Sequence, residues 1–368
     1  MIKPHQFIAL AAASAASVVL ALGLYASSNR WSAGRVEGSA FLPDLAKNIN
    51  SVGAVEVTQG GHTLTIERSG NAWKVRDRAG FPAKPEAART LLIALAQARL
   101  VEPRTSMKDK LSLLELEDPA AKDAKSRRVR VLDTGGKVLS DVVLGKTRYD
   151  AFGAGKGGMY VRQAAATQSW LATGDPRVTA DIKDWVDTKV FASDATKVAR
   201  LTIENPGEEP LLIERTPPPP KEPPKDATAD TAKANEPPKP PAAPSKDGKF
   251  RLAALPDGKK LKKGITMDSI VEAFGSIDLD DVRKLDATPA GDAVQVLKLE
   301  TEGGPTVTFR LRKDGDASWL SLTAAGTEGD AKKTADEINA RTQGWEFKIP
   351  SWKAEQIGKR RADLFETS

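Results

Sequence analysis

The sequence predicts an α+β protein: two similar repeats, each an antiparallel sheet packed by a long amphipathic helix, after one N-terminal transmembrane helix. Three observations lead to this prediction. Residues 63–68, Thr-Leu-Thr-Ile-Glu-Arg, are echoed by residues 210–215, Pro-Leu-Leu-Ile-Glu-Arg. Strand-like and helix-like patterns surround each copy in the same order, which is the signature of an internal repeat. The chain also carries near its start an apolar segment long enough to cross a bilayer.

The composition fits a folded chain and excludes several kinds of site. Of 368 residues, 40% are hydrophobic and 28% are charged, as in ordinary globular domains. There is no cysteine, so disulfides, thiol nucleophiles and thiolate metal sites are excluded. Only His5 and His62 could serve a histidine site, and His62 follows Gly60-Gly61 in an expected hairpin turn. Aromatic residues make up 5%, too few for a base-stacking surface, so we expect no nucleic-acid partner.

The formal net charge is +6, but the basic residues are scattered along the chain. The two densest groups are Lys259, Lys260, Lys262 and Lys263, and Lys359, Arg360 and Arg361. We expect both groups to be solvated surface, and contact with lipid head groups is the alternative.

Residues 7–25 are uncharged and almost wholly apolar. About 19 helical residues span roughly 28 Å, close to the ~30 Å thickness of the hydrocarbon core. We therefore expect residues 1–40 to be a membrane anchor and tether, with the N-terminus inside and the rest of the chain outside. The alternative is a cleaved signal peptide with a site near Ala21-Leu22-Gly23, which would export the rest of the chain as well.

The first repeat is expected over residues 41–195. Residues 41–45 begin a short helix, and three alternating segments, 55–59, 62–68 and 72–75, predict a meander. Residues 85–100 predict the long helix, because apolar residues recur there at i, i+3, i+4 and i+7. They are Ala88, Leu91, Leu92, Leu95 and Ala98. A second short helix is expected at about 108–117 and a helical turn at 181–185, with further strands at 128–132, 138–144 and 159–162.

The second repeat is expected over residues 196–368. Strands at 198–204, 211–215 and 249–252 repeat the meander, with Phe250 in the place of Trp73. The helix that follows repeats the apolar spacing with Met267, Ile270, Val271, Phe274 and Ile277. Residues 132–136 of the first repeat correspond to the similar residues 299–304 of the second, and Tyr160 corresponds to Trp319.

Residues 216–248 hold eleven of the 24 prolines, mixed with Lys, Glu, Ala and Asp. This composition predicts a disordered segment. It could be an interdomain linker. Its position matches the turn at Ser69-Gly70-Asn71, however, so we expect an insertion in a loop between two strands, with both ends close together.

No catalytic, cofactor-binding or metal-binding residue is predicted, and no cofactor is expected. Gly145-Lys146-Thr147 lacks the preceding glycine and the following helix of a phosphate-binding loop. The glycine-rich residues 153–158 precede a strand, which fits a hairpin tip and not a dinucleotide site. Asp278, Asp280 and Asp281 lack the spacing of a calcium loop, and we expect them to lie at a solvated helix end.

Several short motifs resemble those of the bacterial family catalogued as domain of unknown function 4340. The resemblance covers about residues 41–215 well and returns more faintly from Phe250 to the end, with Ile349-Pro350-Ser351-Trp352-Lys353-Ala354 in a similar closing segment. The other motifs are Leu42-Pro43-Asp44-Leu45, Trp73-Lys74-Val75, Gly80-Phe81-Pro82-Ala83, Leu100-Val101-Glu102-Pro103-Arg104-Thr105, Leu116-Glu117-Asp118-Pro119, Leu144-Gly145-Lys146, Tyr160-Val161-Arg162 and Ser169-Trp170-Leu171.

The resemblance implies a membrane-anchored extracytoplasmic protein. Together with the single apolar segment, it leads us to expect a single-pass protein of the bacterial inner membrane with the bulk of the chain in the periplasm. Some relatives are associated with ATP-binding-cassette transporters, and no catalytic residues are assigned in the family. We therefore expect a binding or scaffolding protein and not an enzyme, one that could be an auxiliary subunit of such a transporter. The alternative is an envelope hydrolase that uses a carboxylate pair. The oligomeric state stays open.

Overall fold

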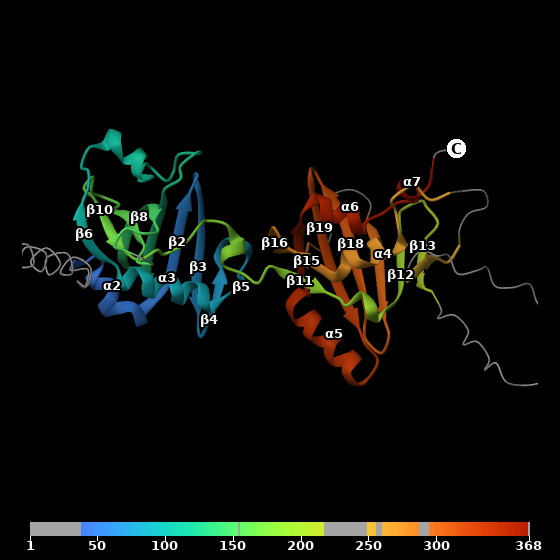
Figure 1. Ribbon diagram of the computed structural model, residues 1–368. Coiled ribbons are helices and arrows are strands. Elements are labelled where there is room, and N and C mark those ends of the chain that lie inside the picture. Colours follow the sequence, from blue (N-terminus) through green and yellow to red (C-terminus); the bar gives the residue numbers. More distant parts are fainter. Residues whose placement is uncertain (1–37, 154, 217–248, 255–259, 287–293, 367–368) are drawn as a thin grey trace, which may run out of the picture. The chain divides into compact units, whose positions relative to one another are not determined.

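The computed structural model describes residues 38–153, 155–216, 249–254, 260–286 and 294–366. They fall into two compact units, the first ending at Trp185 and the second beginning at Val186 (Figure 1). Both units are built on large antiparallel sheets with few helices, which confirms the α+β class. None of the helices in these ranges has the length and apolar character needed to cross a bilayer, and the predicted span, residues 7–25, lies outside them.

The first unit contains a ten-stranded sheet in the order β1-β6-β10-β9-β8-β7-β2-β3-β4-β5. Its helices are α2 (Pro43–Asn48) and α3 (Pro85–Gln97), and a 3₁₀ helix covers Lys108–Leu114. The strands are β1 (Ser39–Ala40), β2 (Val52–Gln59), β3 (His62–Ser69), β4 (Ala72–Val75), β5 (Phe81–Ala83), β6 (Arg99–Pro103), β7 (Arg127–Asp133), β8 (Val138–Arg148), β9 (Gly158–Gln163) and β10 (Ser169–Thr173).

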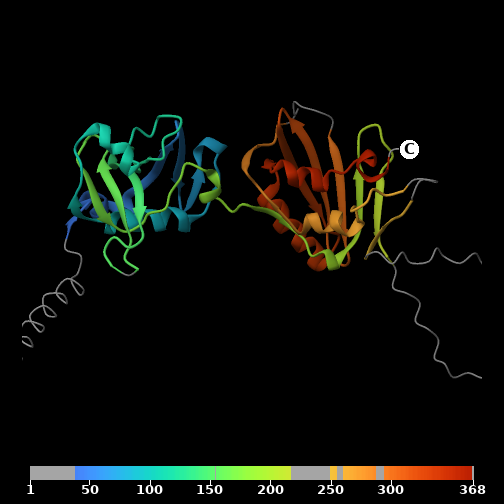
Figure 2. The same ribbon diagram turned by 45° about the horizontal axis from the view of Figure 1, so that its top comes forward.

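One face of this sheet is apolar because valines alternate with polar residues along its central strands. Val55 and Val57 in β2 and Val129 in β7 are fully buried. Helix α3 lies along the sheet in Figures 1 and 2, and its predicted apolar face is buried. The helix ends at Gln97 and not at Leu100, because residues 99–103 pair as β6 with β1 and β10.

The second unit contains an eight-stranded sheet in the order β14-β13-β12-β17-β18-β19-β20-β16, and β11 and β15 form a separate pair. Its helices are α4 (Met267–Glu272), α5 (Gly329–Thr342), α6 (Ser351–Ile357) and α7 (Arg361–Leu364). The strands are β11 (Lys189–Ala192), β12 (Val198–Glu204), β13 (Leu211–Arg215), β14 (Phe250–Leu252), β15 (Ser276–Asp278), β16 (Asp281–Lys284), β17 (Gln295–Thr301), β18 (Thr306–Asp314), β19 (Ala317–Ala325) and β20 (Trp345–Ile349).

The prediction of a long helix over residues 267–277 is wrong in length. Helix α4 has 6 residues and continues only as a 3₁₀ turn over Ala273–Gly275. Ile277 lies in β15 opposite Phe191 of β11, so strand pairing takes the residues that would have extended the helix. Met267, Ile270, Val271, Phe274 and Ile277 are nevertheless all buried, as their spacing indicated.

The long helix of the second unit is α5, which has 14 residues and was not predicted. Its sequence is mostly polar, and only Ala335, Ile338 and Thr342 are buried. Asn339 fixes the helix to the sheet: its amide nitrogen donates to the Ala324 carbonyl, and its amide oxygen accepts from the Ala324 nitrogen, both at 2.8 Å. A polar side chain therefore provides part of the attachment of α5 to the sheet. The apolar periodicity that would have predicted this helix is weak for that reason.

The proline-rich segment joins two neighbouring strands, as the sequence predicted. Strand β13 pairs with β14, with Arg215 opposite Phe250. The Thr216 nitrogen donates to the Lys249 carbonyl at 2.8 Å, so both ends of the segment are held together. Residues 216–248 were predicted to be disordered. Apart from Thr216, they lie outside the described ranges.

A buried charge network joins three strands of the second unit. Arg312 in β18 donates two hydrogen bonds to Glu346 in β20, from Nε at 2.8 Å and from Nη2 at 2.7 Å. Arg283 in β16 donates to Glu346 at 3.0 Å and stacks over Trp319, with its guanidinium carbon 3.7 Å from the ring centroid. The Arg312 and Glu346 side chains are only 5% and 3% exposed, so removing one partner leaves the other charge buried.

We predict that Glu346→Gln lowers the free energy of unfolding of the second unit by roughly 3 kcal/mol, because Arg312 loses its charged partner. Burial alone raises the pKa of Glu346, but the hydrogen bonds and charges of Arg312 and Arg283 outweigh it, so the pKa lies below that of an ordinary glutamate. The stability that Glu346 contributes is therefore present above pH ~4.3 and is lost as pH falls through the lower pKa of the folded state.

Denaturant unfolding measured between neutral and acid pH checks both expectations. The Glu346→Gln variant should lose part of the acid dependence shown by the natural chain. Glu204→Gln is the matched control, because Glu204 is 39% exposed in its 2.7 Å pair with Lys298 and should contribute little. Equal losses in the two variants would contradict the assignment.

Candidate functional site: the polar face of the first sheet

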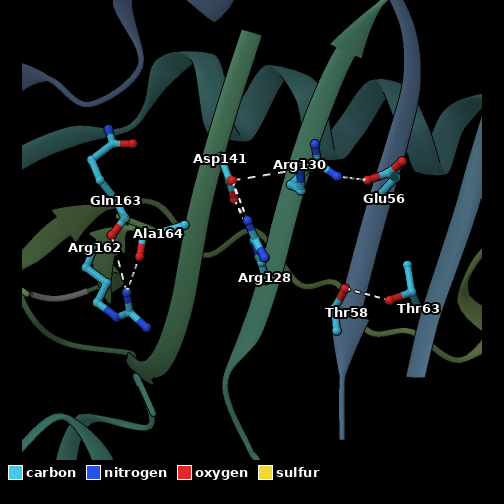
Figure 3. A network of polar contacts seen from close by, with 9 residues as sticks. All are labelled: Glu56, Thr58, Thr63, Arg128, Arg130, Asp141, Arg162, Gln163 and Ala164. Carbon is cyan, nitrogen blue, oxygen red and sulfur yellow. Dashed lines mark hydrogen bonds and ion pairs between the residues drawn. The ribbon is translucent and has the colours of Figure 1, made fainter. Parts of the chain in front are cut away.

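The face of the first sheet opposite the buried valines carries a row of paired charges (Figure 3). The register places Glu56 of β2, Arg130 of β7 and Asp141 of β8 side by side on three adjacent strands. Arg128 is two residues from Arg130 along β7, so its side chain shares this face. We call Glu56, Arg128, Arg130 and Asp141 the charged row.

The charged row is connected by short contacts. Arg128 donates to both oxygens of Asp141, from Nε at 2.8 Å and from Nη2 at 2.6 Å. Arg130 donates from Nη1 to Glu56 at 2.6 Å, and its Nε lies 3.8 Å from Asp141. The hydrogen bond and charge of Asp141 raise the pKa of Arg128, although partial burial opposes this. The four side chains are 20% to 41% exposed, so a partner can reach them.

Arg162 in β9 lies at one end of this face, and its guanidinium is hydrogen-bonded to backbone carbonyls. Its Nε donates to the Leu116 carbonyl at 3.0 Å, and its Nη1 donates to the Ala164 carbonyl at 2.9 Å. Burial lowers the pKa of Arg162. The side chain therefore fixes the segment around Leu116 over the sheet instead of offering its charge to a ligand.

A small hollow of about 240 Å³ lies between the charged row and this segment. Arg128, Asp141 and Arg162 line it from the sheet, and Thr58 and Asp118 complete its polar wall. Thr58 also shares a 2.8 Å hydrogen bond with Thr63 of the neighbouring strand. The surface presents donors and acceptors in alternation, which suits recognition of a polar partner.

A larger hollow of about 660 Å³ lies in the second unit, beside α6. Lys313, Lys359 and Arg360 contribute positive charge to it, and Asp316 and Glu355 contribute negative charge. Because the two signs are mixed, the hollow does not select one class of ligand.

His62 lies at a hairpin turn, as predicted, and the two glycine-containing motifs lie in or before strands. His62 is an exposed residue at the start of β3, opposite Gln59 across the turn. Gly145, Lys146 and Thr147 all lie within β8, and Thr147 donates to Asp175 at 2.9 Å. The glycine-rich residues 153–158 lead into β9, with residue 154 outside the described ranges.

The prediction that Asp278, Asp280 and Asp281 lie at a helix end is wrong. Asp278 ends β15 and Asp281 begins β16, because the chain has already left α4. Within the residues that the structure describes, three or more acidic or histidine side chains nowhere gather closely enough to hold a metal ion.

The basic groups are only partly free. Arg361 pairs with Glu209 at 3.0 Å, and Lys262 donates to the Ala362 carbonyl at 2.7 Å. Lys359 and Arg360 border the larger hollow, and Lys259 lies outside the described residues.

The charged row was not predicted from the sequence. Its one available signal is the stretch Arg127-Arg128-Val129-Arg130-Val131, in which the polar positions of a half-buried strand are arginines. That pattern gives the face but not the partners, since Glu56 and Asp141 reach it from other strands.

The fold and this face define an α+β protein with a polar surface on an antiparallel sheet. Residues 73–238 match the family model described as Domain of unknown function (DUF4340). This match confirms the family resemblance and covers Arg128, Arg130 and Asp141, while Glu56 precedes it. Neither the search of curated proteins nor the search of solved structures gave a match.

We predict that Asp141→Asn destabilises the first unit by about 1 kcal/mol, because Arg128 and Arg130 lose a partly exposed charged partner. Hydrogen exchange of the amides in β7 and β8 should become faster. Asp336→Asn in α5 is the control, since Asp336 is 65% exposed in its pair with Lys332 and should change little. Unchanged exchange in Asp141→Asn would mean that the charged row contributes no stability.

Proposed function

We propose that this protein is a binding or scaffolding protein held to the outer face of a bacterial inner membrane by residues 7–25. The observation that carries the binding role is the charged row, which lies on the polar face of the first sheet with its side chains 20% to 41% exposed. An ATP-binding-cassette transporter is the partner class that we propose, because the sequence resembles a family with relatives associated with such transporters. The apolar character of residues 7–25 supports the membrane anchor.

The arrangement of the charged row favours recognition over hydrolysis. A glycosidase-type reaction needs one carboxyl group that can give up a proton to the leaving group. Asp141 accepts two hydrogen bonds from Arg128, and Glu56 accepts one from Arg130. Both carboxylates are therefore engaged as acceptors, which supports a surface that exchanges ion pairs with a partner.

Co-purification from gently solubilised membranes tests the partner. The natural chain should carry a permease with it. The exchange Arg128→Asp with Asp141→Arg keeps an internal pair but reverses the charges that a partner meets, so the permease should be lost. The exchange Lys332→Asp with Asp336→Lys in α5 is the control and should retain it. A permease that is absent from the natural chain, or retained by the Arg128 and Asp141 exchange, would refute this role for the charged row.

Topology is tested by adding protease to spheroplasts. Digestion of the region after residue 37 from outside is expected, while the anchored N-terminal fragment should stay with the membrane fraction. Complete resistance in intact spheroplasts would overturn the proposed orientation.

We also propose that the two units are copies of one ancestral repeat. The strand order β6-β10-β9-β8-β7-β2-β3-β4 of the first sheet corresponds to the order β16-β20-β19-β18-β17-β12-β13-β14 of the second. Along the chain, β4 of the first set and β14 of the second are each followed by a helix before the next matched strand. The helix is α3 before β6 and α4 before β16. Agreement in eight strands supports duplication more strongly than a shared hexapeptide does.

The pairing registers support the same proposal. Ile66 lies opposite Val55, and Ile213 lies opposite Leu201 in the corresponding strands. Arg68 faces Trp73 as Arg215 faces Phe250. These pairs follow the alignment that the repeated hexapeptide sets.

If the units are copies, the turn of the first should fit the second. We predict that replacing residues 216–249 with Ser-Gly-Asn-Ala, the four residues between Arg68 and Trp73, leaves β13 and β14 paired. Closing a shorter loop should stabilise the second unit by up to about 2 kcal/mol. Denaturant unfolding measures the change, and a four-residue loop of glycine and serine is the control for length alone. Loss of the folded second unit with the transplanted turn would contradict the proposed correspondence.

A further inference from the structure

The connection between β6 and β7 presents two apolar side chains to solvent. Met107 is 55% exposed and Leu113 is 73% exposed. Met107 is the N-cap of the 3₁₀ helix Lys108–Leu114, and Leu113 lies within this helix. A 3₁₀ helix has three residues per turn, so residues at i and i+3 lie on one face. Met107, Lys110 and Leu113 therefore share a face, and all three are exposed.

This exposed face is held in place and is not a poorly packed loop. The inward positions of the same 3₁₀ helix are Leu111, which is buried, and Leu114, which is partly buried. Leu111 packs with Leu116 and Val143 on the sheet, and Arg162 donates to the Leu116 carbonyl at 3.0 Å. The outward direction of Leu113 follows from this anchorage.

The same connection starts beside the point where the described chain begins. Arg99 donates from Nη1 to the Gly38 carbonyl at 2.9 Å, and Ser39 pairs with Leu100 in β6. From Leu100, the chain can reach at most about 25 Å to Met107. The stretch between Tyr25 and Gly38 can bridge at most about 40 Å, so a membrane anchored at residues 7–25 is within range of the exposed face.

We propose that the face of Met107, Lys110 and Leu113, together with the neighbouring exposed Lys108 at the first position of the helix, forms a lipid-binding surface that docks the first unit on the membrane. The apolar side chains enter the region between head groups and acyl chains, and the two exposed lysines contact anionic phosphates. With Asp109 between them, the two lysines leave a net charge of +1 at the N-terminal end of this helix. This inference rests on the proposed membrane anchor.

The absence of cysteine from the chain makes a direct test simple, because a single introduced cysteine can be labelled alone. The full chain carrying Leu113→Cys is labelled with a nitroxide and reconstituted in vesicles of zwitterionic and anionic phospholipid. Collision with a water-soluble nickel reagent should be several-fold weaker than for Val138→Cys, whose native side chain is 41% exposed in the same unit. Equal collision rates at the two positions would overturn the proposal.

Two further measurements separate the possible outcomes. Lys108→Glu with Lys110→Glu, in the Leu113→Cys chain, should raise nickel accessibility toward that of Val138→Cys. If the label is shielded only in native membranes and not in protein-free vesicles, a protein covers this face and the lipid proposal is wrong. Failure of the anchor is seen separately, because the chain would then not float with the vesicles.

Discussion

Strand register is the constraint on which the rest of this structure depends. Side chains alternate between the two faces of a strand, so a shift of one residue would move Val129 to the open face and Arg128 into the core. The buried valines hold the register, and the register in turn sets Glu56, Arg130 and Asp141 side by side. The apolar face of the first sheet is thus the reason that its polar face has a defined pattern of charge.

Several inner strands could be predicted from the sequence, because their own side chains carry the alternating pattern. Strands β4, β12 and β13 begin and end where the alternation and the turns predicted. Edge strands such as β1 and β5 are too short to show a period, and their existence depends on partners far away in the chain. Helix α4 stops early for the same kind of reason, since β11 competes for Ile277.

Helix α5 and the charged row show a second limit of sequence reasoning. Helix α5 is attached partly through Asn339 and the backbone of Ala324, and no hydrophobic period records such a contact. The charged row depends on which strands are neighbours, so single strands reveal arginines on an open face but not the carboxylates that meet them. The Arg312–Glu346 pair was hidden similarly, because buried charges look like surface charges until their partners are known.

The tie between Thr216 and Lys249 has a practical consequence. Because the chain leaves β13 and re-enters β14 at adjacent points, a folded reporter whose own termini lie close together could be inserted between them without stretching the sheet. A fluorescent protein placed there would mark the second unit while leaving both ends of the polypeptide untouched.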